Sequence, residues 1–256
     1  MNNKIYIITA AGGNGTTIKV IDRPLSREEY AVQGKLLGKE TESLGSEQAG
    51  FLIPSLNHFE MAGGEFCGNA SRSAALLLSK LQEDGGRVSF TVSGYDGTVG
   101  GLVEKNGATH FVVSCVFPRM SIDVRPTKLA SGEEVTVVDL GGIVHVVMRK
   151  PFPHDAETYQ KQHRSIVREL GLENRGAVGV IWITGTESAI TMHPVVWVKD
   201  VDTFFYEKSC GSGTIAVAKI TGTSSIIQPT GEMIVALITP ESVTLKSKME
   251  VTHEWN

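Results

Sequence analysis

Two stretches of the sequence place a cysteine directly before glycine, small polar residues and an apolar run. One stretch, Gly63–Ser71, contains Cys67, and the other, Glu207–Thr214, contains Cys210. Because an apolar run behind a Gly-rich turn is typical of a buried helix, each cysteine is expected at a helix N-terminus. Two thiols at matching places in two similar halves predict a single site, with the cysteines on opposite faces of it.

The position of these thiols predicts acid–base chemistry at carbon. A helix N-terminus carries about half a positive charge and free N–H groups, so it favours the thiolate and can hold a carboxylate. One thiolate would remove the α-proton of an amino acid while the thiol on the other face delivers a proton. This scheme requires no metal and no pyridoxal cofactor. The residues expected to hold the α-carboxylate follow the two cysteines: Gly68, Asn69, Gly211, Ser212, Gly213 and Thr214.

Four further residues can be interpreted from the sequence. Each has a structural interpretation, and Asn14, Glu47 and His145 also have a possible place at the site. Asn14 lies in the Gly-rich stretch 11–17, where it is either a turn residue or a contact to the substrate. Glu47 precedes a strand and is either solvated or directed into a cleft. His145 lies in an apolar strand, in the core or in a cleft wall. Cys115 is expected to be buried and inert, because no turn or helix start follows it.

Length and composition narrow the class of protein. The chain has 256 residues, of which 41% are hydrophobic and 20% charged, as in an ordinary soluble globular protein. A formal charge of −4 and the lack of a basic run argue against a nucleic-acid partner. The first apolar stretch, Ile5–Thr9, is too short for a signal peptide or a membrane span. Three cysteines do not make a secreted disulfide framework, so we expect a cytoplasmic protein.

The apolar pattern predicts the same order of elements in both halves. Each half has strands, then the Cys–Gly turn and its helix, then hairpins. Two more helices are expected at 26–37 and 155–170, with His163 on the solvent face of the second. The predicted fold class is α+β, with two pseudo-symmetric halves that each wrap a mostly antiparallel sheet around a central helix. We expect the halves to span 1–118 and 119–256, with a last strand that can return to the first half.

These motifs resemble those of the diaminopimelate epimerase superfamily of cofactor-independent racemases. Phe66–Asn69 and Cys210–Thr214 are similar to its two catalytic signatures. Weaker similarities lie at Gly13–Asn14, Leu140–His145 and Gln228–Gly231. The resemblance implies the epimerase fold, an amino acid as the small-molecule partner, and catalysis by the two cysteines without cofactor or metal.

The resemblance to the diaminopimelate epimerases themselves is incomplete. The asparagines and the arginine with which those enzymes contact the distal end of their substrate are replaced here by Met61, by Gly142 or Ile143, and by Ala177. A second charged head group would stay unpaired in such a site, which is costly. Diaminopimelate therefore fits poorly.

The chain is more similar to histidine racemases, including those of staphylopine-type metallophore pathways. It shares with them Glu47–Phe51, the motif Gly-x-Glu-Phe-Cys-Gly-Asn-Ala and a compact Glu-x-Ser-Cys-Gly-Ser-Gly-Thr. This resemblance implies that Glu47 faces the imidazole or the amine of the substrate, and that Glu207 contacts the α-ammonium. By the same analogy Cys67 deprotonates the L form, Cys210 deprotonates the D form, and the protein is a homodimer.

We therefore predict a pyridoxal-independent racemase that interconverts L- and D-histidine. One alternative is a diaminopimelate or proline-type epimerase of the same fold. The other is a thiol redox or metal-binding protein that uses the same two cysteines. It would need a partner motif such as Cys-x-x-Cys, which the sequence lacks.

Overall fold

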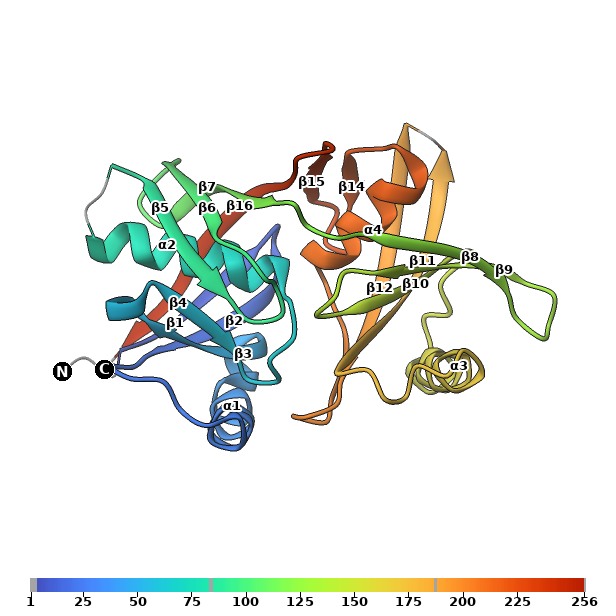
Figure 1. Ribbon diagram of the computed structural model, residues 1–256, viewed down its shortest axis with the longest axis horizontal. Coiled ribbons are helices and arrows are strands. Elements are labelled where there is room, and N and C mark those ends of the chain that lie inside the picture. The colour runs from blue at the N-terminus through green and yellow to red at the C-terminus, as the bar shows by residue number, and fades with distance from the viewer. Residues whose placement is uncertain (1–3, 83–84, 187, 256) are drawn as a thin grey trace.

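The computed structural model describes residues 4–82, 85–186 and 188–255. The chain forms two lobes that lie side by side, and each lobe holds a helix against a curved sheet (Figure 1). The mixed α+β class and the two mostly antiparallel halves confirm the fold predicted from the sequence. No helix among the described residues is long and apolar enough to cross a membrane.

The first lobe contains two helices and seven strands along the chain. The helices are α1 (Arg27–Thr41) and α2 (Gly68–Gln82). The strands are β1 (Ile5–Ala10), β2 (Gly13–Val20), β3 (Ser46–Ile53), β4 (His58–Met61), β5 (Arg87–Val92), β6 (Val99–Lys105) and β7 (His110–Pro118).

The remaining elements follow in the second part of the chain. The helices are α3 (Ala156–Glu169) and α4 (Gly211–Thr221). The strands are β8 (Asp123–Lys128), β9 (Glu134–Asp139), β10 (Val144–Arg149), β11 (Ala177–Thr186), β12 (Ala189–Val198), β13 (Thr203–Tyr206), β14 (Ser225–Ile227), β15 (Met233–Ile238) and β16 (Ser242–Trp255).

The long strand β16 connects the two lobes. It pairs with β15 through Val243–Lys246, with β7 through Ser242–Glu250, and with β1 through Met249–Trp255, antiparallel in each case. Hydrogen bonding therefore continues from the strands of one lobe into those of the other.

The two central helices are buried on all sides along most of their length. In α2 every residue from Gly68 to Leu78 is buried, and in α4 every residue from Gly211 to Ala218 is buried. Most of these side chains are small or apolar, and the buried polar ones have hydrogen-bond partners, as Arg72 has in Asn69 and Ser247. Each predicted helix after a cysteine is therefore confirmed, and each is the core of its lobe.

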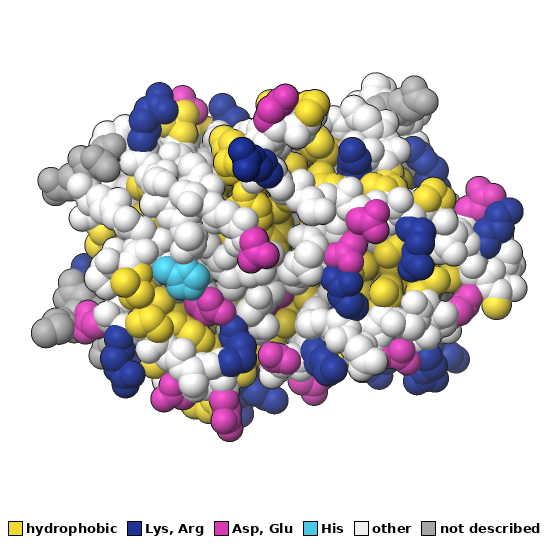
Figure 2. Space-filling model, in the orientation of Figure 1, with side chains coloured by type: hydrophobic (Ala, Val, Ile, Leu, Met, Phe, Trp, Pro, Cys, Tyr) yellow, Lys and Arg dark blue, Asp and Glu magenta, His cyan; other side chains and the backbone are white. Residues whose placement is uncertain are grey.

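The outer helices begin at capping residues that the sequence pattern indicates. Ser26 and Glu29 form a reciprocal capping box at the start of α1, and Asp155 accepts from the Thr158 amide at the start of α3. On the face shown in Figure 2, acidic and basic side chains are interspersed rather than gathered by sign.

Two local expectations were wrong. His163 does not face solvent: it is 1% exposed, and its Nε2 lies 3.0 Å from the carbonyl oxygen of Val178. The first turn is also tighter than 11–17. Only Ala11 and Gly12 form it, both with positive φ, and β2 already begins at Gly13.

Candidate active site

The N-termini of the two central helices touch each other. A Cβ atom on Gly211 would lie 2.9 Å from the carbonyl carbon of Gly68 and 3.0 Å from the amide nitrogen of Asn69. A Cβ atom on Gly68 would lie 3.2 Å from the Cα of Gly211. Only glycine allows the backbones to come so close. Cys67 and Cys210, which directly precede these glycines, are thereby brought to one junction.

Each thiol caps the helix that it precedes. The amide of Ala70 donates to Cys67 Sγ at 3.4 Å, and the amide of Gly213 donates to Cys210 Sγ at 3.3 Å. The amide of Thr214 is also engaged, by the carbonyl of Cys210.

Four first-turn amides at the junction remain available. Within the described chain, no acceptor binds the N–H groups of Gly68, Asn69, Gly211 or Ser212. Free N–H groups at two facing helix N-termini create a positive potential that favours an anion such as a carboxylate.

Two asparagines hold the segment that leads into Cys210. Asn69 Nδ2 donates to the carbonyl of Ser209 at 3.0 Å, and Asn14 Nδ2 donates to the same oxygen at 2.9 Å. Arg72, fully buried, donates to Asn69 Oδ1 at 2.6 Å and so fixes the orientation of this amide. The side chains of both asparagines, which the sequence suggested for substrate contact, therefore bridge the two lobes.

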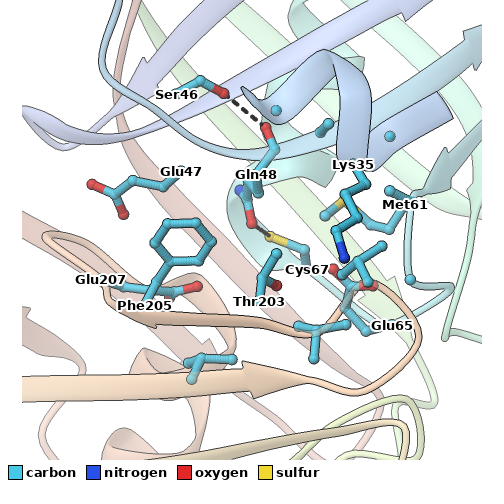
Figure 3. Close-up of a pocket in the computed structure, with 18 of the residues that line it drawn as sticks. Lys35, Ser46, Glu47, Gln48, Met61, Glu65, Cys67, Thr203, Phe205 and Glu207 are labelled. Carbon is cyan, nitrogen blue, oxygen red and sulfur yellow. Dashed lines mark hydrogen bonds between the residues drawn. The ribbon is translucent and has the colours of Figure 1, made fainter. Parts of the chain in front are cut away.

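A cavity of about 190 Å³ lies beside Cys67 and is lined by both lobes. Its walls include Cys67, Gln48, Ser212 and three glutamates, Glu47, Glu65 and Glu207 (Figure 3). Cys210 is 2% exposed and does not line this cavity, although Ser212 and Glu207, which contact it, do. Cys67 is thus open to the cavity, while Cys210 lies behind its wall.

Each thiol has a defined polar partner. Cys67 Sγ donates to Gln48 Oε1 at 3.2 Å, and Gln48 Nε2 in turn donates to Thr16 Oγ1 at 2.7 Å. For Cys210 the neighbouring acid is Glu207, whose carboxylate raises the pKa of the thiol.

Ser212 links Cys210 to a buried histidine. Its hydroxyl oxygen lies 3.6 Å from Cys210 Sγ and 2.9 Å from Nε2 of His145. His145 is fully buried, as its apolar strand predicted, and burial lowers its pKa to about 3. It is therefore a neutral imidazole that orients the Ser212 hydroxyl.

The thiols are not poised as thiolates in this structure, in contrast to the expectation from their helix positions. Burial, together with the charges of Glu207 and Glu65, raises the pKa of Cys67 to about 12. Burial and Glu207 also raise the pKa of Cys210 well above its ordinary value. The helix amides lower both values, but the removal of water and the nearby carboxylates outweigh them.

The three cavity glutamates have raised pKa values as well. Burial raises the pKa of Glu47 to about 7, that of Glu65 to about 7 and that of Glu207 to about 8. None of the ion pairs formed by the described residues includes any of them. A cavity with three carboxyl groups outside any ion pair favours a ligand that brings positive charge or N–H donors.

Several residues of this network were not identified from the sequence. Gln48 and Glu65 stand next to predicted residues inside quoted motifs, so proximity in sequence was an available signal. Gln228 also lies in a quoted segment, Gln228–Gly231, but the sequence assigned it no role: its Oε1 accepts from the Cys210 amide at 2.9 Å, and its Nε2 donates to Thr214 Oγ1 at 3.1 Å. Only the fold brings it to the start of α4.

Solved structures share the whole fold at low sequence identity. A predicted epimerase from Pseudomonas aeruginosa matches with a TM-score of 0.67 and 14% identity, over 100% of this chain and 99% of that chain. A phenazine biosynthesis protein of the PhzF family from Enterococcus faecalis matches with a TM-score of 0.58 and 14% identity, over 99% and 98% of the two chains. These similarities concern the fold alone. The two solved structures are named as a PhzF-family protein and as a predicted epimerase, and neither is named as a diaminopimelate epimerase.

Sequence comparison identifies the family. A histidine racemase from Fusobacterium nucleatum is 30% identical over 210 residues, which cover 75% of this chain and 74% of the relative. A second histidine racemase, from another strain of that species, is 31% identical over the same shares. The model of the histidine racemase CntK N-terminal domain matches residues 6–252. The chain therefore belongs to the histidine racemase CntK family and is an enzyme of the racemase class.

Proposed function

We propose that this protein interconverts L- and D-histidine without a cofactor, with Cys67 and Cys210 as its two bases. The observation that carries the proposal is the contact between Gly68 and Gly211, which joins two helix N-termini that each follow a thiol. The names of the family and of the relatives support histidine as the substrate.

The α-carboxylate of the substrate binds at the helix junction in this proposal. The free amides of Gly68, Asn69, Gly211 and Ser212 would donate to it. When the α-proton leaves, negative charge spreads onto the carboxylate oxygens. Fixed N–H dipoles in a site without water stabilise such charge strongly, which lowers the barrier to proton removal.

The proton transfer itself balances between the two thiols. The Cys67 thiolate takes the α-proton of the L form, and the electron pair of the broken C–H bond delocalises into the carboxylate. The Cys210 thiol then gives its proton to the opposite face of the carbon. The enzyme ends with Cys67 protonated and Cys210 ionised, ready for the D form. The assignment of each cysteine to one enantiomer rests on the family resemblance.

The glutamates explain how a thiol with a raised pKa can lose its proton when the substrate binds. The α-ammonium would lie near Glu47 and Glu207, and Glu47 is close enough to Glu207 to raise its pKa. The positive charge of the ammonium would offset the carboxylate charges that raise the pKa values of both thiols. Glu207, the carboxyl group beside Cys210, would exchange a proton with its thiol.

We also propose that the halves 1–118 and 119–256 close on the substrate. Closure would move Cys210, now behind the cavity wall, into contact with the substrate and would exclude water from the reaction. Small-angle scattering profiles that are identical with and without a tight ligand would argue against this movement.

Two finer assignments rest on the resemblance to racemases of metallophore pathways. We infer that the protein is a homodimer and that its D-histidine product is a building block of a metallophore. Light scattering of the purified protein tests the first, and loss of metal-chelating product after gene deletion tests the second.

The decisive experiment is α-proton exchange in D₂O, followed by NMR, with histidine, diaminopimelate, proline and other common amino acids. The wild type should exchange and racemise histidine. Cys67→Ser and Cys210→Ser should lose racemisation, because an alcohol is too weak a base, while Cys115→Ser should keep it. Full racemisation by either of the first two variants would contradict the two-base mechanism, and preferred exchange of another amino acid would contradict the substrate.

A further inference from the structure

Glu65 is a buried carboxyl group that lines the cavity and takes no part in the proposed proton transfer. Its side chain is only 8% exposed, it lines the cavity, and its Oε2 has no hydrogen-bond partner within the described chain. A buried carboxylate oxygen without a partner in the chain is free to accept a hydrogen bond from a bound ligand.

The nearby basic side chains do not fill this role. Arg27 binds Glu60 through Nη1 and the backbone carbonyls of Met61 and Ala62 through Nη2. Lys35 extends from α1 toward the same end of the cavity (Figure 3), yet no ion pair joins it to Glu65 in the part of the chain that the structure describes. The charge of Arg27 lowers the pKa of Glu65, but no ion pair among the described residues joins the two, and Glu65 Oε2 has no hydrogen-bond partner there.

The chain makes room for this carboxyl group. A Cβ atom on Gly63 would lie 2.6 Å from Glu65 Oε2, so any larger residue at position 63 would displace the carboxyl group from its present place. Apolar side chains from both lobes, Met61, Ile143 and Val198 among them, also line this cavity. A carboxylate beside apolar walls suits a flat ring that carries an N–H donor.

The cavity has two acidic ends on opposite sides of the reactive thiol. In Figure 3, Glu47 and Glu207 lie on one side of Cys67 and Glu65 lies on the other. An amino acid with its α-carbon beside Cys67 and its α-ammonium at the Glu47 end directs its side chain toward Glu65.

We propose that Glu65 accepts a hydrogen bond from a ring N–H of the substrate's imidazole and thereby selects histidine over ring side chains without an N–H. This inference rests on the proposed function. Burial raises the pKa of Glu65 to about 7, close to that of free imidazole, so the two groups can share one proton. A site built to bind an N–H discriminates strongly against an analogue that lacks it, because its own polar group is then left unpaired.

The test compares histidine with β-(2-thienyl)alanine, whose ring has a similar shape but no N–H. The readout is the ratio of kcat/KM for α-proton exchange of the two amino acids in D₂O. The wild type should favour histidine by at least about 100-fold. Glu65→Met should bring the ratio close to one, mainly through loss of histidine exchange. Glu42→Met is the matched control, because Glu42 lines the same cavity at its exposed rim, and it should leave the ratio unchanged.

A second variant guards against misfolding. Glu65→Gln keeps the shape and an acceptor oxygen but loses the charge, so the ratio should fall at least about threefold, since charge-assisted hydrogen bonds are the stronger ones. A folded Glu65→Met or Glu65→Gln protein with the wild-type ratio would overturn the role of Glu65 and leave the racemase proposal intact. A wild type that exchanges no histidine would overturn both.

Discussion

The side-chain amide of Asn69 donates to the carbonyl and the hydroxyl of Ser209, at 3.0 and 3.2 Å. Asn69 lies in the first turn of α2, two residues after Cys67, and Ser209 directly precedes Cys210. Because Ser209 also donates to the carbonyl of Ala10 at 2.6 Å, the approach to the second thiol is built largely from the first lobe. The relative placement of the two thiols is thus determined by hydrogen bonds between the lobes.

Asn69→Ala should weaken both the fold and the reaction. The variant leaves the buried Arg72 without its Oδ1 acceptor and removes two hydrogen bonds to Ser209. We expect the free energy of unfolding to fall by about 1–3 kcal/mol, together with the racemisation rate. Urea unfolding and chiral chromatography measure the two effects. Asn106→Ala, at an exposed asparagine, is the control, and equal behaviour of both variants would show that the bridge does not position the thiols.

Gly211→Ala should separate the two helix N-termini. The new methyl group would meet the Gly68 carbonyl carbon at 2.9 Å and must push the backbones apart. A displacement of about 1 Å in an active site can cost about 100-fold in rate, and we expect a loss of that order in kcat. Gly100→Ala in β6, outside the cavity and with no atom beyond its chain neighbours within 4 Å of the new Cβ, is the control and should keep full activity. Wild-type kcat in the first variant would refute the close contact.

The ligand-free protein should lose stability as the pH rises from 6.5 to 8. The folded-state pKa of Glu207 is raised from 4.5 to about 8, so the folded state binds its proton more tightly than the unfolded chain. The contribution of Glu207 to stability is fully present below pH 4.5 and is lost as the pH rises through its folded-state pKa of about 8. The lowered pKa values of His145 and His163 act in the opposite direction, but only below their ordinary value of 6.5.

Glu207→Gln isolates this effect. One pKa unit corresponds to about 1.4 kcal/mol, so the wild type should lose at most about 2 kcal/mol from Glu207 over this pH range. The variant should show a flatter dependence of the urea midpoint on pH. Glu40→Gln, at an exposed glutamate, should retain the wild-type slope. A wild-type midpoint that does not change over this range would argue against burial of these carboxyl groups.

Mild oxidation should inactivate the enzyme reversibly. If closure brings Cys67 and Cys210 to opposite faces of one small substrate, the empty site should allow them to form a disulfide. We expect loss of activity in air, recovery with dithiothreitol, and a mass smaller by the two thiol hydrogens. Cys115→Ser should behave like the wild type, because Cys115 is fully buried in β7 beneath α2. Full activity of the air-oxidised wild type without added thiol would contradict the shared site.

The elements of the fold follow from short-range patterns in the sequence. Apolar runs behind Cys67 and Cys210 predicted the two central helices, and Ser26 and Asp155 indicated where the outer helices begin. Such signals act within one or two turns, so they can be recognised without the rest of the chain. The burial of His163 was missed because a distant carbonyl, that of Val178, satisfies its ring.

The protonation states of the two thiols could not be predicted in the same way. The helix N-termini alone favour ionised thiols, and the sequence carries that signal locally. The opposing effect comes from burial and from the charges of Glu207, in the other lobe, and of Glu65, two residues before Cys67. Likewise Gln228, 18 positions after Cys210, folds back to the start of α4. Burial and the approach of Glu207 depend on packing between the lobes, which no local sequence pattern encodes.

The first lobe cannot complete its strand pairing until β16 has been synthesised. This strand supplies partners to both β1 and β7, yet it follows every other element in the sequence. During translation the first lobe therefore leaves the ribosome with β1 and β7 each lacking a partner strand on one side. A nascent chain stalled before residue 242 would expose these edges, which makes it a substrate for chaperones and a candidate for aggregation rather than a folded half-enzyme.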